Sequence, residues 1–148
     1  MSEIKIIPME REHIPVLARL ERICFEHPWT EQALEEELDN RTAHFIVAVK
    51  DDRIIGYAGV FVVCESCYIA DIGVFPEYRR MGAAKKLLSC ASENAAKMGA
   101  QSISLEVRPS NEAAVSLYTS CGFEEVGLRK NFYRDPQEDA LIMTKIIG

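Results

Sequence analysis

The sequence lacks any long apolar run, and this absence sets the first limit on what the chain can be. None of its apolar stretches approaches the roughly 20 residues that a membrane-spanning helix needs, and the first residues carry no signal-peptide core. We therefore predict a cytoplasmic protein with no membrane partner. Cysteine is scarce and odd in number, at five residues, which argues against a complete disulfide framework.

Positive charge is in deficit: 17 lysines and arginines stand against 23 aspartates and glutamates, and the formal net charge is −6. This argues against nucleic acid as a direct partner, because binding to a phosphate backbone needs a basic face. The balance fits a cationic amine or a basic peptide better. The acidic run Glu35–Glu37 is interpreted as a solvated helix face, with attraction of a basic peptide as the alternative.

Metal and triad chemistry lack their usual residue groupings. None of the three histidines has a metal-like or triad-like companion, and no Ser-His-Asp grouping is apparent. Cys64 and Cys67 have the C-x-x-C spacing of zinc and redox sites, but a four-ligand zinc site needs a second close pair, which is missing. We therefore predict no metal, and we interpret these two cysteines as flanking a hairpin turn.

The 148 residues, 48% apolar and 27% charged, are typical of one globular domain over residues 1–148. Apolar periodicity predicts the order β-α-α-β-β-β-α-β-α-β-β, with Thr30 capping the second helix. The predicted strands span residues 3–7, 45–49, 54–63, 68–74, 102–107, 124–133 and 140–147, and the helices 10–24, 30–38, 80–99 and 110–122. Strands 68–74 and 102–107 flank a helix, so they should lie parallel in a mixed α/β (α+β) sheet.

The segment after strand 68–74 carries the strongest functional signal. Two arginines, Arg79 and Arg80, precede small residues that open a helix, which places Gly82, Ala83 and Ala84 in its first turn. The N–H groups there have no partner inside the helix and give a partial positive charge, so the turn is a natural seat for a phosphate. Gly82 also lets a bulky anion approach the backbone closely. The sequence therefore predicts that a phosphorylated ligand binds at this turn.

Three phosphate-binding motifs compete for this turn. A P-loop needs Gly-x-x-x-x-Gly-Lys followed by Ser or Thr, and a dinucleotide fold needs an early Gly-x-Gly-x-x-Gly; both are absent. The third motif is Arg/Gln-x-x-Gly-x-Gly/Ala, which Arg79, Gly82 and Ala84 fill. It resembles the signature with which the GCN5-related N-acetyltransferases (GNAT) bind the pyrophosphate of coenzyme A. The resemblance covers essentially the whole chain, and it implies the GNAT fold and acetyl-CoA as cosubstrate.

Four segments resemble the RimI-type ribosomal-protein alanine acetyltransferases of that family. They are Leu105–Asn111, Ala114–Phe123, Asn131–Tyr133 with Glu138–Ala140, and Phe25 with Pro28–Thr30. By this resemblance Glu106 is the general base, acting through an ordered water, and Tyr118 is the general acid that protonates the coenzyme A thiolate. The residues alone leave open that Glu106 is a solvated carboxylate at a strand end and that Tyr118 is a core aromatic.

The resemblance also implies which residues bind the cofactor. The main chain of Ile72, Gly73 and Val74 would pair with the pantetheine arm, and the Val74 N–H would polarise the thioester carbonyl. Asn111 would contact the cofactor, and its alternative role is that of a helix N-cap. The pyrophosphate would be held by the turn made of Arg79, Arg80, Met81, Gly82, Ala83, Ala84 and Lys85.

The implied reaction is acetyl transfer to the N-terminal α-amine of a protein, with the N-terminal Ala of a small-subunit ribosomal protein as the expected acceptor. An α-ammonium has a pKa of about 7.7–8.0, so roughly a tenth is neutral near pH 7, against a few in ten thousand for lysine. The Phe25–Trp29 loop and the Asn131–Asp139 hairpin are expected to border the peptide groove. The alternatives are a lysine side chain or a small amine as acceptor, and a non-catalytic acyl-CoA-binding module. We expect a monomer or a weak dimer.

Overall fold

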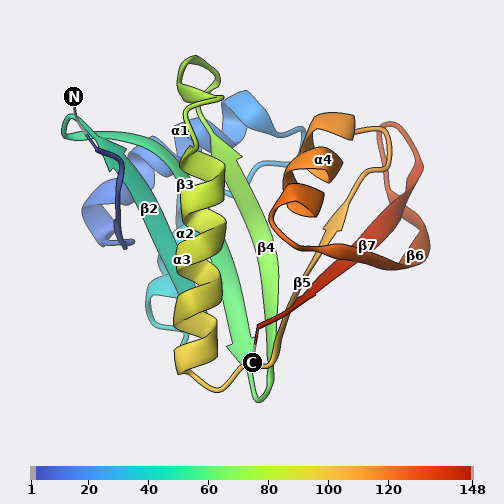
Figure 1. Ribbon diagram of the computed structural model, residues 1–148. Coiled ribbons are helices and arrows are strands. Elements are labelled where there is room, and N and C mark those ends of the chain that lie inside the picture. Colours follow the sequence, from blue (N-terminus) through green and yellow to red (C-terminus); the bar gives the residue numbers. More distant parts are fainter. Residues whose placement is uncertain (1–2, 148) are drawn as a thin grey trace.

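The computed structural model describes residues 3–147, which form a mixed sheet with helices on both faces (Figure 1). The strands follow the order β1-β2-β3-β4-β5-β7-β6 across the sheet. Their bounds are β1 Lys5–Pro8, β2 Ala43–Lys50, β3 Arg53–Val63, β4 Ser66–Val74, β5 Ser102–Val107, β6 Glu124–Tyr133 and β7 Glu138–Ile146. The α-helices are α1 Ile14–Cys24, α2 Glu31–Leu38, α3 Ala83–Lys97 and α4 Glu112–Ser120, with 3₁₀ turns η1 Arg11–His13 and η2 Pro76–Tyr78.

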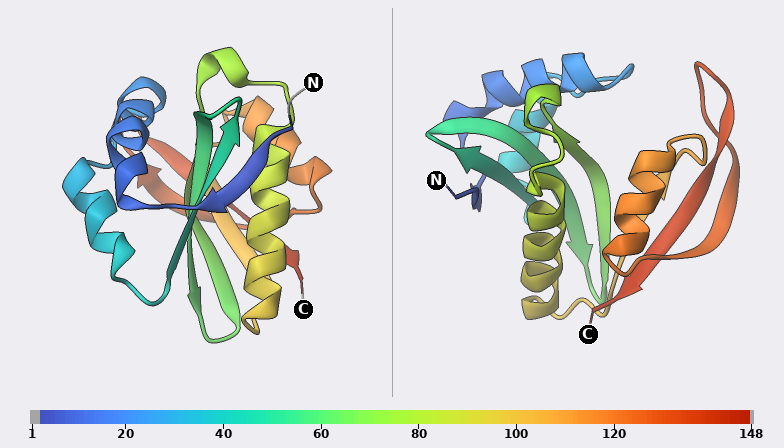
Figure 2. Two further views of the ribbon diagram at one scale, coloured as in Figure 1. Left: turned by 90° about the vertical axis from the view of Figure 1, so that its left-hand side faces the viewer. Right: turned by 45° about the horizontal axis from the view of Figure 1, so that its top comes forward.

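Two apolar clusters hold the helices against the sheet. The larger one contains Leu87 and Leu88 of α3 and Ile103 of β5, all nearly inaccessible to solvent. The other lies on the opposite face and joins Leu17 of α1 and Leu34 of α2 to the sheet. Figure 2 shows this division, with α1 and α2 on one side of the sheet and α3 on the other. Burial of such apolar stripes is the main force that stabilises the layers.

Strands β4 and β5 are parallel neighbours, as predicted, but they pair over only three residues. Ser66, Cys67 and Tyr68 lie opposite Ser102, Ile103 and Ser104, and beyond them no pairing continues within the described part of the chain. The pairing of β4 with β3 is also irregular: Ile69 and Asp71, two positions apart in β4, lie opposite consecutive residues of β3. In Figure 1 the two strands diverge from this paired end. The divergence leaves the main chain of β4 beyond Tyr68 unpaired along the edge that faces β5.

The predicted order of strands and helices is confirmed, and most of the predicted bounds are close. Thr30 caps α2, since its hydroxyl accepts a hydrogen bond from the Ala33 N–H at 3.1 Å. The predicted start of the third helix at Arg80 is wrong: α3 begins at Ala83, because Arg80 (φ 65°) and Gly82 (φ 87°) adopt left-handed backbone conformations that no right-handed helix contains.

The C-x-x-C pair lies at the β3–β4 hairpin turn, with Cys64 in the turn itself and Cys67 in the strand that follows, so the interpretation as hairpin cysteines is confirmed except that Cys64 does not flank the turn. Cys64 is exposed in the turn, with φ 55°, whereas Cys67 is buried in β4. The two thiols therefore differ in environment, and burial raises the pKa of Cys67 to about 11. Within residues 3–147 no helix combines the length and the apolar character that a membrane span needs.

Candidate active site

The first turn of α3 presents main-chain N–H groups that have no acceptor inside the helix. The first helical hydrogen bond is made by the Lys86 N–H to the Gly82 carbonyl at 3.0 Å, so the N–H groups of Ala83, Ala84 and Lys85 precede the bonded ladder. Gly82 occupies the N-cap and has no side chain that could accept their hydrogen bonds. Apart from Gly82 and its two chain neighbours, no described residue has a heavy atom within 4 Å of the position that a Cβ would take on Gly82. The turn is therefore open to an anion.

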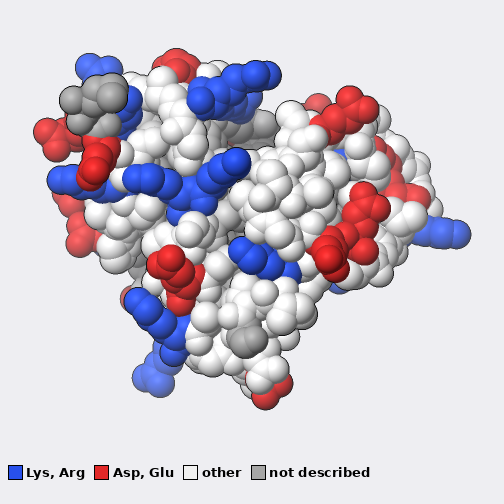
Figure 3. All heavy atoms as spheres, in the orientation of Figure 1, with Lys and Arg blue, Asp and Glu red and all other residues white. Residues whose placement is uncertain are grey.

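Basic side chains surround this turn, and Figure 3 shows Lys and Arg gathered over the η2 turn and the start of α3. Arg80 and Lys85 are exposed. Arg79 instead donates from Nε to the Val74 carbonyl at 3.1 Å and from Nη2 to Cys24 Sγ at 3.5 Å. Its guanidinium thus fixes the end of β4, so its contribution to a phosphate would come from its charge and its remaining N–H groups. Ala83 is buried, so its side chain is not available to a ligand.

The end of β4 lies between α1 and the open strand edge. The Phe75 N–H donates to the Ile55 carbonyl of β3 at 2.9 Å, so by strand alternation the Val74 N–H points away from β3. A Cβ on Gly73 would lie 2.8 Å from Leu20 Cδ2 and 3.2 Å from Phe25 Cε2. The glycine therefore allows α1 and the following loop to pack directly on the strand.

Glu106 lies on β5, and its side chain is only 7% exposed. Oε1 accepts a hydrogen bond from the Tyr68 hydroxyl of β4. Arg129 of β6 places Nε 3.1 Å from Oε2, but this ion pair is not aligned as a hydrogen bond, and Oε2 is left as a buried acceptor without a directed donor. The alternative of a solvated carboxylate is therefore wrong. Tyr68 and Arg129 were missed by the sequence reasoning, because neither contact has a local signature.

Tyr118 is 8% exposed in α4, with its ring centroid 5.9 Å from that of Phe123. The alternative of a core aromatic is therefore confirmed for the ring. Burial, followed by the charge of Asp71, raises the pKa of the Tyr118 hydroxyl above its ordinary value. The phenol consequently stays protonated at neutral pH, which a proton donor requires.

Asn111 is the N-cap of α4, since its Oδ1 accepts from the Ala114 N–H at 3.2 Å. This confirms the structural alternative for the side-chain carbonyl. Its contact with the cofactor stays a prediction.

Two segments of the RimI-like pattern contact each other across the β5–α4 loop. Glu138 accepts hydrogen bonds from the Ser110 N–H and hydroxyl, both at 2.8 Å, and from Arg108 Nη1 at 3.3 Å. These hydrogen bonds lower the pKa of Glu138, and those from Ser110 have a larger effect than the one from Arg108. Arg108 also donates to the Arg134 and Pro136 carbonyls at 2.8 Å each. These contacts of Arg108, Ser110 and Glu138 therefore hold the β6–β7 hairpin beside the end of β5.

The two expected walls of the peptide groove also approach each other. His27 of the α1–α2 loop lies with Nε2 3.5 Å from Asp135 Oδ2 in the β6–β7 turn, and both side chains are exposed. The Phe25–Trp29 loop and the Asn131–Asp139 hairpin thus border one region of the surface. Within the hairpin, the Asn131 N–H donates to Asp139 Oδ1 at 2.8 Å.

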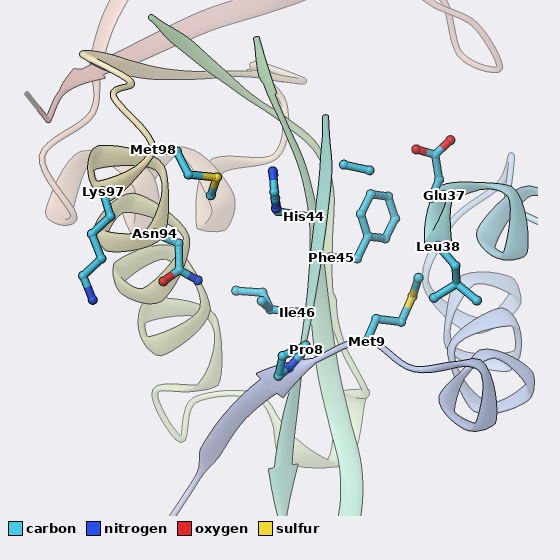
Figure 4. Close-up of a pocket in the computed structure, with 11 residues that line it drawn as sticks. Pro8, Met9, Glu37, Leu38, His44, Phe45, Ile46, Asn94, Lys97 and Met98 are labelled. Carbon is cyan, nitrogen blue, oxygen red and sulfur yellow. The ribbon is translucent and has the colours of Figure 1, made fainter. Parts of the chain in front are cut away.

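Two other features lie away from this region. A pocket follows the edge of β2 beyond the end of β1, where Figure 4 shows Phe45 and Leu38 on one side of the strand and His44 and Met98 on the other. It includes none of the residues predicted to bind the cofactor or to take part in catalysis. Separately, His13 has two acidic neighbours, Glu10 and Glu12, and its Nδ1 already accepts from the Glu10 N–H at 2.9 Å.

The sheet, the open helix turn and the polar groups beside β4 and β5 define a GNAT-type N-acyltransferase. The model of the acetyltransferase (GNAT) family matches residues 14–123. The chain belongs to this family and is an acetyltransferase, and enzymes of this family use acetyl-CoA.

Similar proteins include ribosomal-protein acetyltransferases. The chain is 39% identical over 136 residues to a Bacillus subtilis (strain 168) protein provisionally assigned as a [ribosomal protein bS18]-alanine N-acetyltransferase, with 91% of this chain and 90% of the relative covered. It is 32% identical over 140 residues to the Escherichia coli (strain K12) [ribosomal protein bS18]-alanine N-acetyltransferase, covering 93% and 94% of the two chains. The crystal structure of the Escherichia coli ribosomal-protein-S18-alanine N-acetyltransferase matches with a TM-score of 0.90 and 30% identity over 99% of this chain and 95% of that one. Arabidopsis thaliana NAA60, solved with a bisubstrate analogue, shares the fold with a TM-score of 0.90 at 19% identity, over 99% of both chains.

Proposed function

We propose that this enzyme transfers the acetyl group of acetyl-CoA to the N-terminal α-amine of a protein, with the N-terminal Ala of a small-subunit ribosomal protein as its acceptor. The observation that carries the proposal is the buried Glu106 carboxylate on β5, opposite β4, with one oxygen held by Tyr68 and the other without a directed donor. The similarity to bS18-alanine N-acetyltransferases over nine tenths of the chain supports the choice of acceptor.

Acetyl-CoA is held at two places in this proposal. The N–H groups that open α3, aided by Arg80 and Lys85, bind the diphosphate. The main chain of Ile72, Gly73 and Val74 pairs with the pantetheine arm along the open edge of β4. The Val74 N–H donates to the thioester oxygen, where negative charge develops as the amine attacks.

Two side chains move the protons. Glu106 accepts a proton from the acceptor amine through an ordered water, the new N–C bond forms, and the C–S bond breaks. Tyr118 gives its proton to the departing thiolate. A carboxylate is a modest base, and an α-amine, with a pKa of about 7.7–8.0, needs less help than a lysine side chain.

The test is a peptide panel in which the acetylated atom is located by mass spectrometry. An Ala-starting basic peptide should be acetylated on its α-amine, while the same peptide with a blocked N-terminus and an internal lysine should not react. Glu106→Gln and Tyr118→Phe should each lower kcat by about 10²–10⁴-fold, with the Kd for acetyl-CoA nearly unchanged. Acetylation of the lysine peptide alone, or unaltered rates in both variants, would reject the proposal.

A further inference from the structure

A buried polar cluster beneath the α1–α2 loop is not used by the proposed mechanism. Glu21 of α1 is 0% exposed, although a carboxylate in that position would be expensive to bury without partners. Its Oε1 accepts from the Trp29 N–H at 2.9 Å, and its Oε2 accepts from the Tyr57 hydroxyl of β3 at 2.7 Å. Asp71 of β4 completes the cluster, with Oδ2 3.3 Å from the Tyr57 oxygen. One helix, one loop and two strands therefore meet at this point.

The placement of one hydroxyl between two carboxyl groups limits which of them receives a hydrogen bond. The Tyr57 hydroxyl has a single hydrogen, and the nearer acceptor is Glu21. Two carboxylates around one hydroxyl would leave Asp71 and Glu21 repelling each other in a buried site. One further proton on Asp71 would remove this repulsion.

The cluster joins the groove wall to the strand that is proposed to hold the thioester. The loop from Phe25 to Trp29 is anchored through the Trp29 N–H to Glu21, and Asp71 directly precedes Ile72 on β4. Phe25 lies over Gly73, with Cε2 3.2 Å from the position that a Cβ would take on this glycine. A change in the cluster would therefore move the loop relative to β4.

We propose that Glu21 and Asp71 form a carboxyl pair that shares one proton beside the Tyr57 hydroxyl, and that this pair positions the α1–α2 loop for the acceptor peptide. Glu21 and Asp71 are positioning residues, because they act through the Trp29 main chain and do not touch the reacting atoms. The inference rests on the proposed function insofar as the loop borders the peptide groove, but the contacts themselves do not depend on it.

Because the pair depends on one shared proton, it persists only at pH values at which that proton is bound. Burial, followed by the hydrogen bond and charge of Glu21, raises the pKa of Asp71 to about 9. Ionisable groups from the elements packed against Asp71 face it: Glu21 and Cys24 from α1, Tyr57 from β3 and Tyr118 from α4. Above pH 9 Asp71 loses this proton, and the loop should loosen.

The first measurement needs no catalysis, because Trp29 is the single tryptophan of the chain. Its fluorescence should change between pH 7.5 and 10 with a midpoint near 9 in the wild type. Asp71→Asn supplies a donor that does not titrate, and it should abolish this change. Cys24→Ala should keep it, because the thiol, whose pKa is also raised, is a competing source. Superimposable titrations of wild type and Asp71→Asn, or loss of the change in Cys24→Ala, would overturn the inference.

The second measurement compares the peptide KM with the Kd of acetyl-CoA. The wild-type KM should rise about tenfold more than that of Asp71→Asn by pH 10, because only about a tenth of the pair then holds its proton. Using one peptide for both proteins cancels the titration of the peptide itself. At pH 7.5 Asp71→Ala should raise the KM roughly tenfold, Asp71→Asn should restore it, and the Kd of acetyl-CoA should stay within about twofold in both.

The two measurements separate the two proposals. A wild type that acetylates no peptide refutes the proposed function, while the fluorescence titration still decides the role of the pair. An active wild type whose KM responds equally in Asp71→Ala and Asp71→Asn contradicts the pair alone. Calorimetric binding of acetyl-CoA by every variant shows that each one is folded.

Discussion

Gly82→Ala is the substitution that tests the phosphate turn most cleanly, because the chain contains a matched control. Gly82 (φ 87°) and Gly99 (φ 95°) lie at opposite ends of α3, and both have open space where a Cβ would be added. Alanine in the left-handed region costs about 1–2 kcal/mol, of which about 0.4–1 kcal/mol is offset by the smaller entropy of the unfolded chain. Each variant should therefore lose roughly 1 kcal/mol of stability, or about 3 °C in Tm.

The two variants should differ in binding. In Gly82→Ala the methyl group projects beside the N–H groups that open α3, where the diphosphate is proposed to sit, whereas Gly99 lies a helix length away. We expect the Kd of acetyl-CoA to rise at least tenfold, or about 1.4 kcal/mol, in Gly82→Ala and to stay unchanged in Gly99→Ala. Calorimetric titration with acetyl-CoA and thermal denaturation measure both quantities. Equal affinities at equal stability would refute binding at this turn.

Three further predictions concern stability and the hairpin. Leu87→Ala, at a fully buried position of α3, should lower the free energy of unfolding in urea by about 2–5 kcal/mol, whereas exposed Ser89→Ala should change it by less than about 0.5 kcal/mol; a small loss for Leu87→Ala would contradict the core assignment. Glu138→Gln should lower Tm at pH 7. Because the pKa of Glu138 is lowered in the folded state, its contribution to the free energy of unfolding is present above its unfolded pKa and is lost as pH falls through its folded pKa. A Tm difference from wild type that persists undiminished at pH 3 would disprove this. The stability contribution of Asp71 should depend on pH in the opposite direction. Because its pKa is raised, this contribution is fully present below about pH 4 and is lost as pH rises toward about 9, so the wild-type Tm should fall relative to that of Asp71→Asn over this range. Parallel Tm curves for the two proteins would disprove it.

The order of the elements could be predicted from the sequence because each depends on local patterns. Alternating residues around Ile103 and Leu105 mark β5, and Thr30 and Asn111 are cap residues that the structure places at helix N-termini. The start of α3 was misplaced, because a left-handed Arg80 has no signal in the residue itself. The divergence of β4 from β5 depends on the packing of the whole sheet, and no local pattern encodes it.

The candidate site was predictable only in part, for the same reason. Glu106, Tyr118 and the α3 turn could be found through motifs that are continuous in sequence. The partners of Glu106 are distant in the sequence: Tyr68 lies 38 positions before it, and Arg129 lies on β6. Glu21 lies among charged neighbours on an amphipathic helix and gives no hint of its full burial, because its partners Tyr57 and Asp71 are distant in sequence.

The most direct test of the central claim is to locate the acetyl group on an Ala-starting ribosomal-protein peptide after incubation with acetyl-CoA and either the wild type or Glu106→Gln. We predict α-amine acetylation by the wild type and a rate at least about a hundredfold lower for the variant. Acetylation at a lysine side chain, or equal rates for the two proteins, would contradict it.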